Sequence, residues 1–342
     1  MDGRTGWGRQ AALVGVVFLA TLALLVGVRG LVGALGSTGS GASPGGTVGA
    51  IRSVLPGSPG GAGGSSGPAA SFGPDPSGTV VLTGAGDIGL CGSDGAQLTS
   101  DLLLRQAGLF FTAGDNAYQT GSAAQFADCY DPTWGRVKDR TVLPVAGNHD
   151  WLTPNAAGYL GYFGAAAAPQ GVTWYSRDLG AWHIVVLDSD CDNVGGCGLD
   201  SPQGQWLASD LAASSARCTL AIWHHPRFSS GEHGDDVQVA PFWELLHRDG
   251  AELVINGHDH DYERFAPQDP SGAIERPGGI REIVVGTGGA ELRSFSRTAA
   301  NSEFRQSGVF GVLRLTLHPA NYDWEFLPVS GDVADSGSTP CH

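Results

Sequence analysis

Five places in the sequence share one arrangement, in which an apolar run ends, often at a glycine, and a side chain able to bind a metal follows. The side chains at these places are Asp87, Asp115, Asn148, His224 and the pair His258 and His260. Singly, such residues are common in turns, at helix N-caps and as structural histidines. The carboxyl ends of strands in an α/β domain meet in one crevice. The recurrence therefore predicts that these side chains converge on one site.

The types of side chain indicate which ions this site would bind. Carboxylate, amide oxygen and imidazole suit hard or borderline ions such as iron, manganese and zinc. No cysteine stands among them, which argues against iron–sulfur or copper(I) chemistry. One carboxylate between two ions would hold them ~3.5–4 Å apart, the spacing of two-metal hydrolases. Such a pair activates water and binds the attacking and leaving oxygens of a phosphoryl displacement.

The pattern resembles the calcineurin-like metallophosphoesterase superfamily and, within it, the short, single-domain purple acid phosphatases. That family has five blocks: GDxG, GDxxY, GNH[DE], a strand ending in HxP, and GHxH. They stand here as Gly86-Asp87-Ile88-Gly89, Gly114-Asp115-Asn116-Ala117-Tyr118, Gly147-Asn148-His149-Asp150, His224-His225-Pro226 and Gly257-His258-Asp259-His260. The resemblance spans about residues 79–289 and implies a four-layer α/β/β/α sandwich of two mixed sheets.

The resemblance also implies a role for each ligand. For the first metal, ferric iron in the family, it implies the ligands Asp87, Tyr118 and His260. For the second metal, Fe²⁺, Zn²⁺ or Mn²⁺, it implies the ligands Asn148, His224 and His258. Asp115 would bridge the two ions. A tyrosine at the position of Tyr118 distinguishes the purple acid phosphatases from most other branches, and its tyrosinate gives them their colour.

Three further histidines receive different expectations. His149 would contact the substrate phosphate instead of a metal. His233 resembles the family's mobile histidine that protonates the leaving alkoxide, a general-acid task suited to imidazole. His225 is not expected to bind metal, because the first histidine of HxP is the ligand. Glu263 and Arg264 are expected to brace the GHxH loop.

The implied reaction is hydrolysis of phosphate monoesters by metal-hydroxide attack, with an acidic to neutral optimum. A phosphodiesterase or nucleotidase on the same scaffold is the alternative enzyme. A catalytically silent, metal-bearing surface binding protein is a third reading, although all seven ligand positions are occupied by suitable residues.

Short β-rich runs alternate with helical patterns from Thr79 onward, which predicts an α/β catalytic domain over residues 79–342. Strand-like runs precede each proposed ligand. Further strands are expected at 183–187, 283–285, 312–317 and 322–327, and helices at 97–106, 205–213 and 242–247. The run at 322–327 is expected to close the domain. Residues 328–342 are polar and are expected to be partly disordered unless Cys341 is bridged.

Six cysteines, none in a CxxC pair, predict up to three disulfides in an exported protein. Cys191 and Cys197 bracket a glycine-rich loop that a disulfide could close. Cys218 with Cys341 and Cys91 with Cys129 would be the other pairs, although the sequence leaves all fifteen connectivities of six cysteines open.

Residues 1–35 hold an uncharged apolar run, 11–28, after Arg4 and Arg9, and are predicted to be a signal-anchor or a cleaved signal peptide. An uncleaved membrane anchor is favoured. Residues 36–78 are rich in Gly, Ser and Pro and predict a flexible linker. The net charge of −15 disfavours binding to nucleic acid. The expected partners are small phosphoesters and a membrane, in an extracytoplasmic location, with the oligomeric state left open.

Overall fold

The computed structural model describes residues 77–342. The predicted signal or anchor segment, 1–35, and nearly all of the predicted linker, 36–78, lie outside the described residues. Within residues 77–342 no helix is long and apolar enough to cross a membrane.

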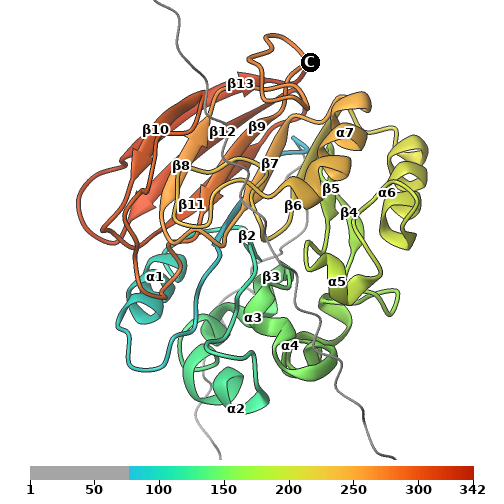
Figure 1. The fold of residues 1–342 in the computed structure, drawn as a ribbon. Coiled ribbons are helices and arrows are strands. Elements are labelled where there is room, and N and C mark those ends of the chain that lie inside the picture. Colours follow the sequence, from blue (N-terminus) through green and yellow to red (C-terminus); the bar gives the residue numbers. More distant parts are fainter. Residues whose placement is uncertain (1–76) are drawn as a thin grey trace, which may run out of the picture. The chain divides into compact units, whose positions relative to one another are not determined.

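The strands of the described domain form two mixed sheets (Figure 1). The six-stranded sheet has the order β13 (Asp335–Pro340), β12 (Asn321–Pro328), β11 (Gly311–Leu317), β1 (Val80–Ala85), β2 (Leu109–Thr112) and β3 (Thr141–Leu143). The seven-stranded sheet has the order β10 (Ser302–Gln306), β8 (Tyr262–Phe265), β9 (Arg281–Val285), β7 (Leu253–Asn256), β6 (Cys218–Ile222), β5 (Trp182–Val186) and β4 (Tyr175–Leu179).

Each sheet contains a parallel group of strands. In the first sheet β1, β2 and β3 run parallel, and in the second β5, β6, β7 and β9 do so. Parallel neighbours end at the same edge of a sheet, so the loops after β1, β2 and β3 leave one edge together. The loops after β6 and β7 leave the second sheet together in the same way.

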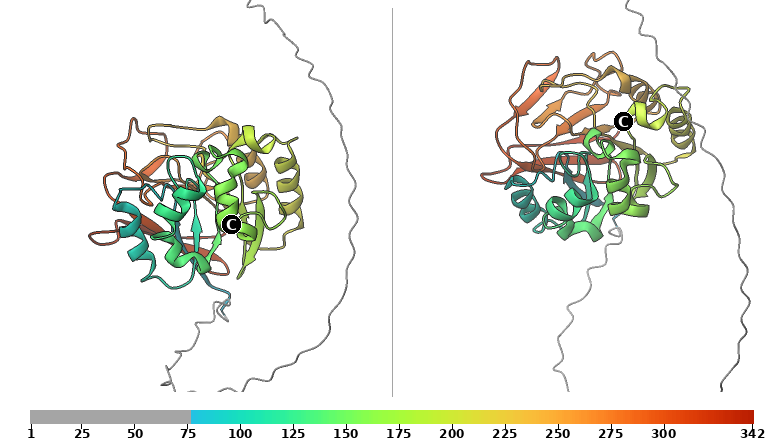
Figure 2. Two further views of the ribbon diagram at one scale, coloured as in Figure 1. Left: turned by 90° about the horizontal axis from the view of Figure 1, so that it is seen from below. Right: turned by 60° about the horizontal axis from the view of Figure 1, so that its bottom comes forward.

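Helices connect and flank the strands. The α-helices are α1 (Gly95–Leu103), α2 (Ala123–Gln125), α3 (Asn148–Trp151), α4 (Ala157–Phe163), α5 (Cys191–Val194), α6 (Pro202–Ala213) and α7 (Ala240–Arg248). Short 3₁₀ or π segments are η1 (Phe126–Tyr130), η2 (Trp134–Arg140), η3 (Pro154–Ala156), η4 (Gly164–Ala166) and η5 (Val237–Val239). In Figure 1, α2, α3 and α4 lie below the sheets and α6 and α7 lie at the upper right; seen from below, the green helices come to the front (Figure 2).

The burial pattern confirms the four-layer α/β/β/α sandwich. Along β5, Ile184 and Val186 join the core that both sheets share, whereas Val185 packs with side chains of α6 and α7. Side chains alternate between the faces of a strand, so every residue of β5 is buried because both of its faces are covered. On the outer side of the six-stranded sheet, α1 contacts β11, and η2 contacts β2 and β3.

The three proposed disulfides are confirmed: Cys91–Cys129, Cys191–Cys197 and Cys218–Cys341. The prediction that residues 322–327 close the domain is wrong, because β13 follows and pairs antiparallel with β12. The strand was missed because its sequence, Asp-Ser-Gly-Ser-Thr-Pro, lacks apolar alternation. As the edge strand of its sheet it buries little beyond Asp335. The Cys218–Cys341 bridge fixes the end of this strand to β6.

Candidate metal centre

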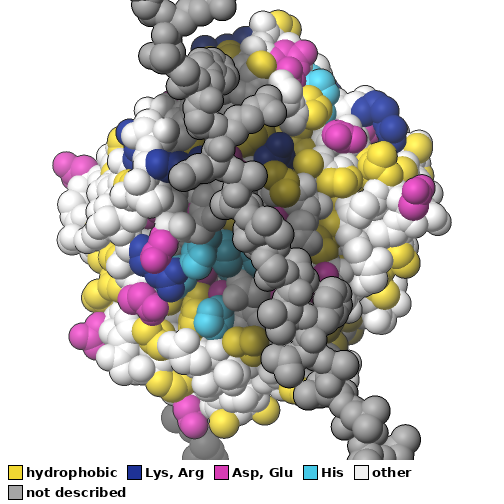
Figure 3. Space-filling model, in the orientation of Figure 1, with side chains coloured by type: hydrophobic (Ala, Val, Ile, Leu, Met, Phe, Trp, Pro, Cys, Tyr) yellow, Lys and Arg dark blue, Asp and Glu magenta, His cyan; other side chains and the backbone are white. Residues whose placement is uncertain are grey.

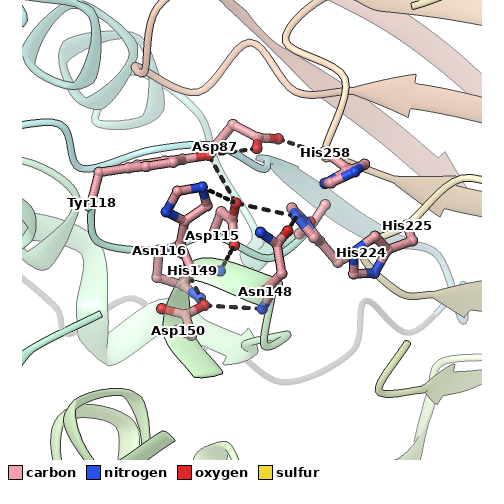
Figure 4. Close-up of polar contacts among 12 residues, drawn as sticks. Asp87, Asp115, Asn116, Tyr118, Asn148, His149, Asp150, His224, His225 and His258 are labelled. Carbon is pink, nitrogen blue, oxygen red and sulfur yellow. Dashed lines mark hydrogen bonds and ion pairs between the residues drawn. The ribbon is translucent and has the colours of Figure 1, made fainter. Parts of the chain in front are cut away.

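The proposed ligands lie where the parallel strands end. Asp87 follows β1, Asp115 follows β2, and Asn148 opens α3 just beyond β3. From the other sheet, His224 follows β6, and His258 and His260 follow β7. The side chains from the two sheets point toward one another across the gap between the loops (Figure 4).

In the loops that follow the strands, proposed ligands as well as glycines adopt the backbone conformations of sharp turns. Glycines precede several of the ligands, but Asp87, Asp115 and His258 themselves have φ of 60°, 49° and 71°. Non-glycine residues rarely adopt this left-handed region, and each costs about 1–3 kcal/mol unless its surroundings enforce it. Gly114 is needed for close approach, since a Cβ there would lie 2.3 Å from Nδ1 of His224.

One half of the cluster is gathered around the hydroxyl of Tyr118. This hydroxyl donates to Oδ1 of Asp87 at 2.7 Å and lies 3.2 Å from Nε2 of His260. Nε2 of His260 is also 3.3 Å from Oδ1 of Asp87. The three residues proposed for the first metal are thus mutual neighbours, and all are buried.

The other half is gathered around His224. Its Nε2 lies 3.1 Å from Oδ1 of Asn148, and its ring centroid lies 5.0 Å from that of His258. His258 is joined to the first half through its backbone, whose N–H donates to Oδ2 of Asp87 at 2.8 Å.

Asp115 belongs to both halves. Its Oδ2 lies 3.0 Å from the Tyr118 hydroxyl on one side and 3.3 Å from Nε2 of His224 on the other. Its second oxygen, Oδ1, accepts the backbone N–H of His149 at 2.8 Å. A single carboxylate therefore stands where a ligand shared by two ions would have to stand.

Backbone carbonyls set the direction of three imidazoles. Nδ1 of His224 contacts the carbonyl of Ala113 at 2.8 Å, and Nδ1 of His260 contacts the carbonyl of Glu291 at 2.5 Å. Nδ1 of His149 contacts the carbonyl of Gln119 at 2.6 Å. A carbonyl partner fixes the proton on Nδ1, so the lone pair of Nε2 is free to face the cluster, as in metal-binding histidines.

Neighbouring charges within the cluster shift the pKa values of its side chains. Burial opposes ionisation of Asp115, but the adjacent His224 outweighs burial and holds the pKa of this carboxyl well below its usual range. Burial would lower the pKa of His224, yet Asp115 raises it to about 10. Burial, with the charges of Asp115 and Asp87, raises the pKa of the Tyr118 phenol. Negative charge in the cluster is therefore balanced by protons, which cations could replace.

The donor set fits metal ions. Ligand atoms of Asp87, Asp115 and His224 lie within 4.8 Å of one another, and all three residues are buried. Buried charges in proteins are paired or coordinate metals. A second group with similar spacing, Cys218, Glu252 and Cys341, is excluded as a metal site because its two cysteines form a disulfide.

His233 and His225 lie at the edge of the cluster, beside His258. The ring centroids of His233 and His225 each lie 4.3 Å from that of His258. Nδ1 of His225 is bonded to the hydroxyl of Ser189 at 2.8 Å, which agrees with its expected place outside the ligand set. All three histidines border a cavity of about 330 Å³. In the space-filling view histidines gather in a hollow, with basic and acidic side chains beside them (Figure 3).

Arg293 is a further residue of the site, which no sequence motif indicated. Its Nη1 lies 2.6 Å from Nε2 of His233, and its backbone N–H donates to the carbonyl of His260 at 3.0 Å. Arginine can only donate, so Nε2 of His233 accepts and the neutral ring keeps its proton on Nδ1. The residue follows the Gly286–Gly289 run in the chain, and no local pattern indicated that it would reach a loop so distant in sequence.

The expectation for Glu263 and Arg264 is corrected by their partners. Glu263 accepts the backbone N–H of Ser230 at 2.7 Å and also its hydroxyl, so it braces the loop of His233 and not the GHxH loop. Arg264 instead forms ion pairs with Glu303 and Asp335. Both side chains extend from β8, whose alternation points them to different faces.

Comparison with known proteins places this geometry in context. Residues 84–262 match the calcineurin-like phosphoesterase family. Purple acid phosphatase 21 of Arabidopsis thaliana is 28% identical over 275 residues, which cover 70% of this chain and 58% of that protein. Acid phosphatase A of Cryphonectria parasitica is 27% identical over 201 residues, covering 51% and 40%. The chain thus spans about half the length of the curated relatives that it matches.

Solved structures share the fold. A purple acid phosphatase from yellow lupin seeds superposes with a TM-score of 0.64 at 21% identity, covering 77% of this chain and 54% of that one. The anchor in the inner membrane complex of Plasmodium, GAP50, superposes with a TM-score of 0.57 at 17% identity, covering 77% and 89%. Proteins with different descriptions therefore share this architecture, so function must be argued from the site.

Proposed function

Because the chain belongs to the calcineurin-like phosphoesterase family, in its purple acid phosphatase branch, we propose that it hydrolyses phosphate monoesters with two metal ions. The observation that carries the proposal is the position of Asp115. One of its oxygens is approached by Tyr118 from one sheet's loops and by His224 from the other's. An arrangement of this kind has no role in simple turn formation, whereas two-metal hydrolysis requires a shared ligand.

The ligands divide into two sets around this carboxylate. The proposed ligands of the first ion, ferric iron, are Asp87, Tyr118 and His260. The proposed ligands of the second ion, Fe²⁺, Zn²⁺ or Mn²⁺, are Asn148, His224 and His258. When bound, such a pair supplies activated water and stabilises charge on the phosphoryl oxygens.

Two histidines act on the substrate in this proposal. His149 directs Nε2 toward the cluster, 3.9 Å from Oδ2 of Asp115, where it can donate to a phosphate oxygen once protonated or rotated. His233 borders the cavity, and its doubly protonated ring, with Nε2 released from Arg293, would protonate the leaving oxygen and return to the neutral form. Room for the leaving group lies in the same cavity, whose other walls include Ser189, Asp190, Asp192 and Gln238.

An extracytoplasmic location belongs to the same proposal. Three disulfides suit an oxidising compartment, and the apolar run at 11–28 suits an anchor or a signal peptide. Fusion of a reporter to the carboxyl end, with protease protection and N-terminal sequencing, separates an anchored, a cleaved and a cytoplasmic protein.

The experiment that tests the function combines metal analysis with turnover of two ester classes. The purified protein is expected to contain about two metals per chain, one of them iron, and to hydrolyse monoesters faster than bis-esters. Faster bis-ester turnover would make it a phosphodiesterase on the same scaffold. Bound metals with no turnover of either class would make it a metal-bearing binding protein. A folded, metal-supplemented protein that retains no metal would refute the proposal.

A further inference from the structure

The loop that presents His233, residues 229–235, is fixed by a carboxylate from the GHxH segment. Oδ1 of Asp259 accepts the backbone N–H of His233 at 2.9 Å, and its Oδ2 accepts the hydroxyl of Ser229. Asp259 is 1% exposed. Gly231 packs directly on this carboxylate, since a Cβ at Gly231 would lie 2.2 Å from Cγ of Asp259. The loop is thus closed around a single buried side chain.

Asp259 also belongs to the segment that carries two proposed ligands. It lies between His258 and His260 in the chain, and the ring of His258 is the neighbour of the His233 ring. Any displacement of the metal ligands would therefore move Asp259 and, through its two hydrogen bonds, the loop.

Other side chains hold the loop, but at different points. Glu263 accepts from Ser230, and Arg297 donates to the carbonyl of Ser229 at 2.7 Å. Arg293 contacts the ring of His233, not its backbone. Within residues 77–342, the side chain that bonds to the main chain of His233 is that of Asp259.

We propose that Asp259 is the positioning residue for His233. It links the loop of the proton donor to the metal-binding segment, which keeps the imidazole within hydrogen-bond reach of the leaving oxygen. The inference rests on the proposed function, in which His233 is the acid. Geometry has a large effect on such a step, because a displacement of ~1 Å can cost about 10²-fold in rate. General acids act within hydrogen-bond reach of the atom that they protonate.

The chain offers matched controls. Asp261 is a second buried carboxylate, adjacent to His260, and neither of its oxygens has a hydrogen-bond partner among the described residues. Asp261→Asn changes a similar group at a similar depth without touching the loop. Asp259→Asn keeps an oxygen for the His233 N–H and an NH₂ for Ser229, so it should rescue what Asp259→Ala loses.

The kinetic test compares an activated ester, p-nitrophenyl phosphate, with a poor leaving group, glycerol phosphate, in the full-length protein. Asp259→Ala is expected to lower kcat/KM about 10²-fold for glycerol phosphate and far less for the activated ester. Asp259→Asn and Asp261→Asn should not show this selectivity. In a His233→Ala background, Asp259→Ala should add no further selective loss, because residues acting as one unit are not additive.

A second readout needs neither metal nor turnover. Amide hydrogen exchange of His233 should become at least about tenfold faster in Asp259→Ala, and should stay near wild type in Asp259→Asn and Asp261→Asn. Two results for Asp259→Ala would refute the positioning role alone. One is an unchanged exchange rate of the His233 amide. The other is an equal loss of kcat/KM for both esters while His233→Ala remains selective. A wild type that hydrolyses neither ester would instead refute the proposed function, and a non-selective His233→Ala would refute its acid role together with this inference.

Discussion

Two groups of histidines in this domain differ in what fixes their rings. At the candidate metal centre, His149, His224 and His260 each direct Nδ1 to a backbone carbonyl. Away from the centre, His183 and His318 have no such carbonyl contact among residues 77–342 and pair with carboxylates of nearby elements. Nδ1 and Nε2 of His183 lie 2.8 and 3.0 Å from oxygens of Asp178 and Asp210, and Nε2 of His318 lies 2.9 Å from Asp323.

The difference shows what each arrangement can do. A carbonyl accepts the Nδ1 proton and turns Nε2 toward the cluster, where a cation would replace the proton that Asp115 and Asp87 favour on His224 and His260. A carboxylate favours the protonated ring and forms an ion pair, which stabilises local structure. The partner of Nδ1 is thus a better guide to function than burial, because His183 and His260 are buried to a similar extent.

The largest effect is expected from the carboxylate that joins the two halves of the centre. Asp115→Asn should reduce bound metal from about two to below one per chain and lower kcat/KM by about 10³-fold, since several kcal/mol of charge stabilisation is lost. The matched control is Asp178→Asn, which removes a carboxylate from a structural histidine. An Asp115→Asn protein with full metal content and activity would contradict the shared-ligand assignment.

A smaller effect is expected from replacing His149, which tests whether every histidine whose Nδ1 contacts a carbonyl is a metal ligand. Its ring is fixed like a ligand, but its proposed contact is the substrate phosphate. His149→Gln should therefore keep both metals while kcat/KM falls about 10²-fold, the usual loss for one donor to a developing negative charge. Loss of one metal per chain would instead make His149 a ligand.

Tyr118 tests the identity of the first ion. Tyr118→Phe should abolish the visible absorption band. It should also weaken iron binding by about 10- to 100-fold, the usual loss of metal affinity when a residue that supports a metal site is removed. Tyr130→Phe is the control, because Tyr130 is buried and its hydroxyl has no hydrogen-bond partner among the described residues. A spectrum unaltered by Tyr118→Phe would exclude a tyrosinate-bound ferric ion.

The sequence could predict the candidate ligands because each depends on local chemistry repeated at strand ends. Asp87 and Asp115 follow apolar runs that are strands for reasons visible in those runs, and parallel pairing then places them at one edge. The apolar run before His224 became β6 in the same way, within a sheet buried on both faces. The meeting of the ligands at one site could therefore be predicted from the strands alone, because parallel strands end at the same edge of a sheet.

Other features of the fold and of the site depend on tertiary contacts that no local sequence pattern indicates. Arg293 reaches His233 across 60 residues of chain, and the bond from His233 to Asp259 spans 26. The strand β13 forms because β12 offers an unpaired edge and the Cys218–Cys341 bridge holds the chain end beside it, not because of its own residues. Partners fixed by tertiary approach are therefore visible only in the folded domain.

The smallest effect is expected at His183, where the comparison predicts a change in stability without a change in function. Burial would lower the pKa of His183, but Asp210 and Asp178 raise it above its ordinary value of 6.5. A raised histidine pKa contributes stability that is fully present below 6.5 and is lost as pH rises through the raised value. His183→Gln should therefore cost about 1 kcal/mol at low pH, reduced by the exposure of Asp178.

The measurement is thermal unfolding of both proteins at pH 6 and pH 9, with a shift in Tm of about 2–4 °C at the lower pH that shrinks at the higher one. Metal content and kcat/KM should match the wild type at both values. A loss of metal in His183→Gln would break the division between the two groups of histidines. A shift in Tm that grows with pH would show that His183 acts as a neutral ring and not as one half of an ion pair.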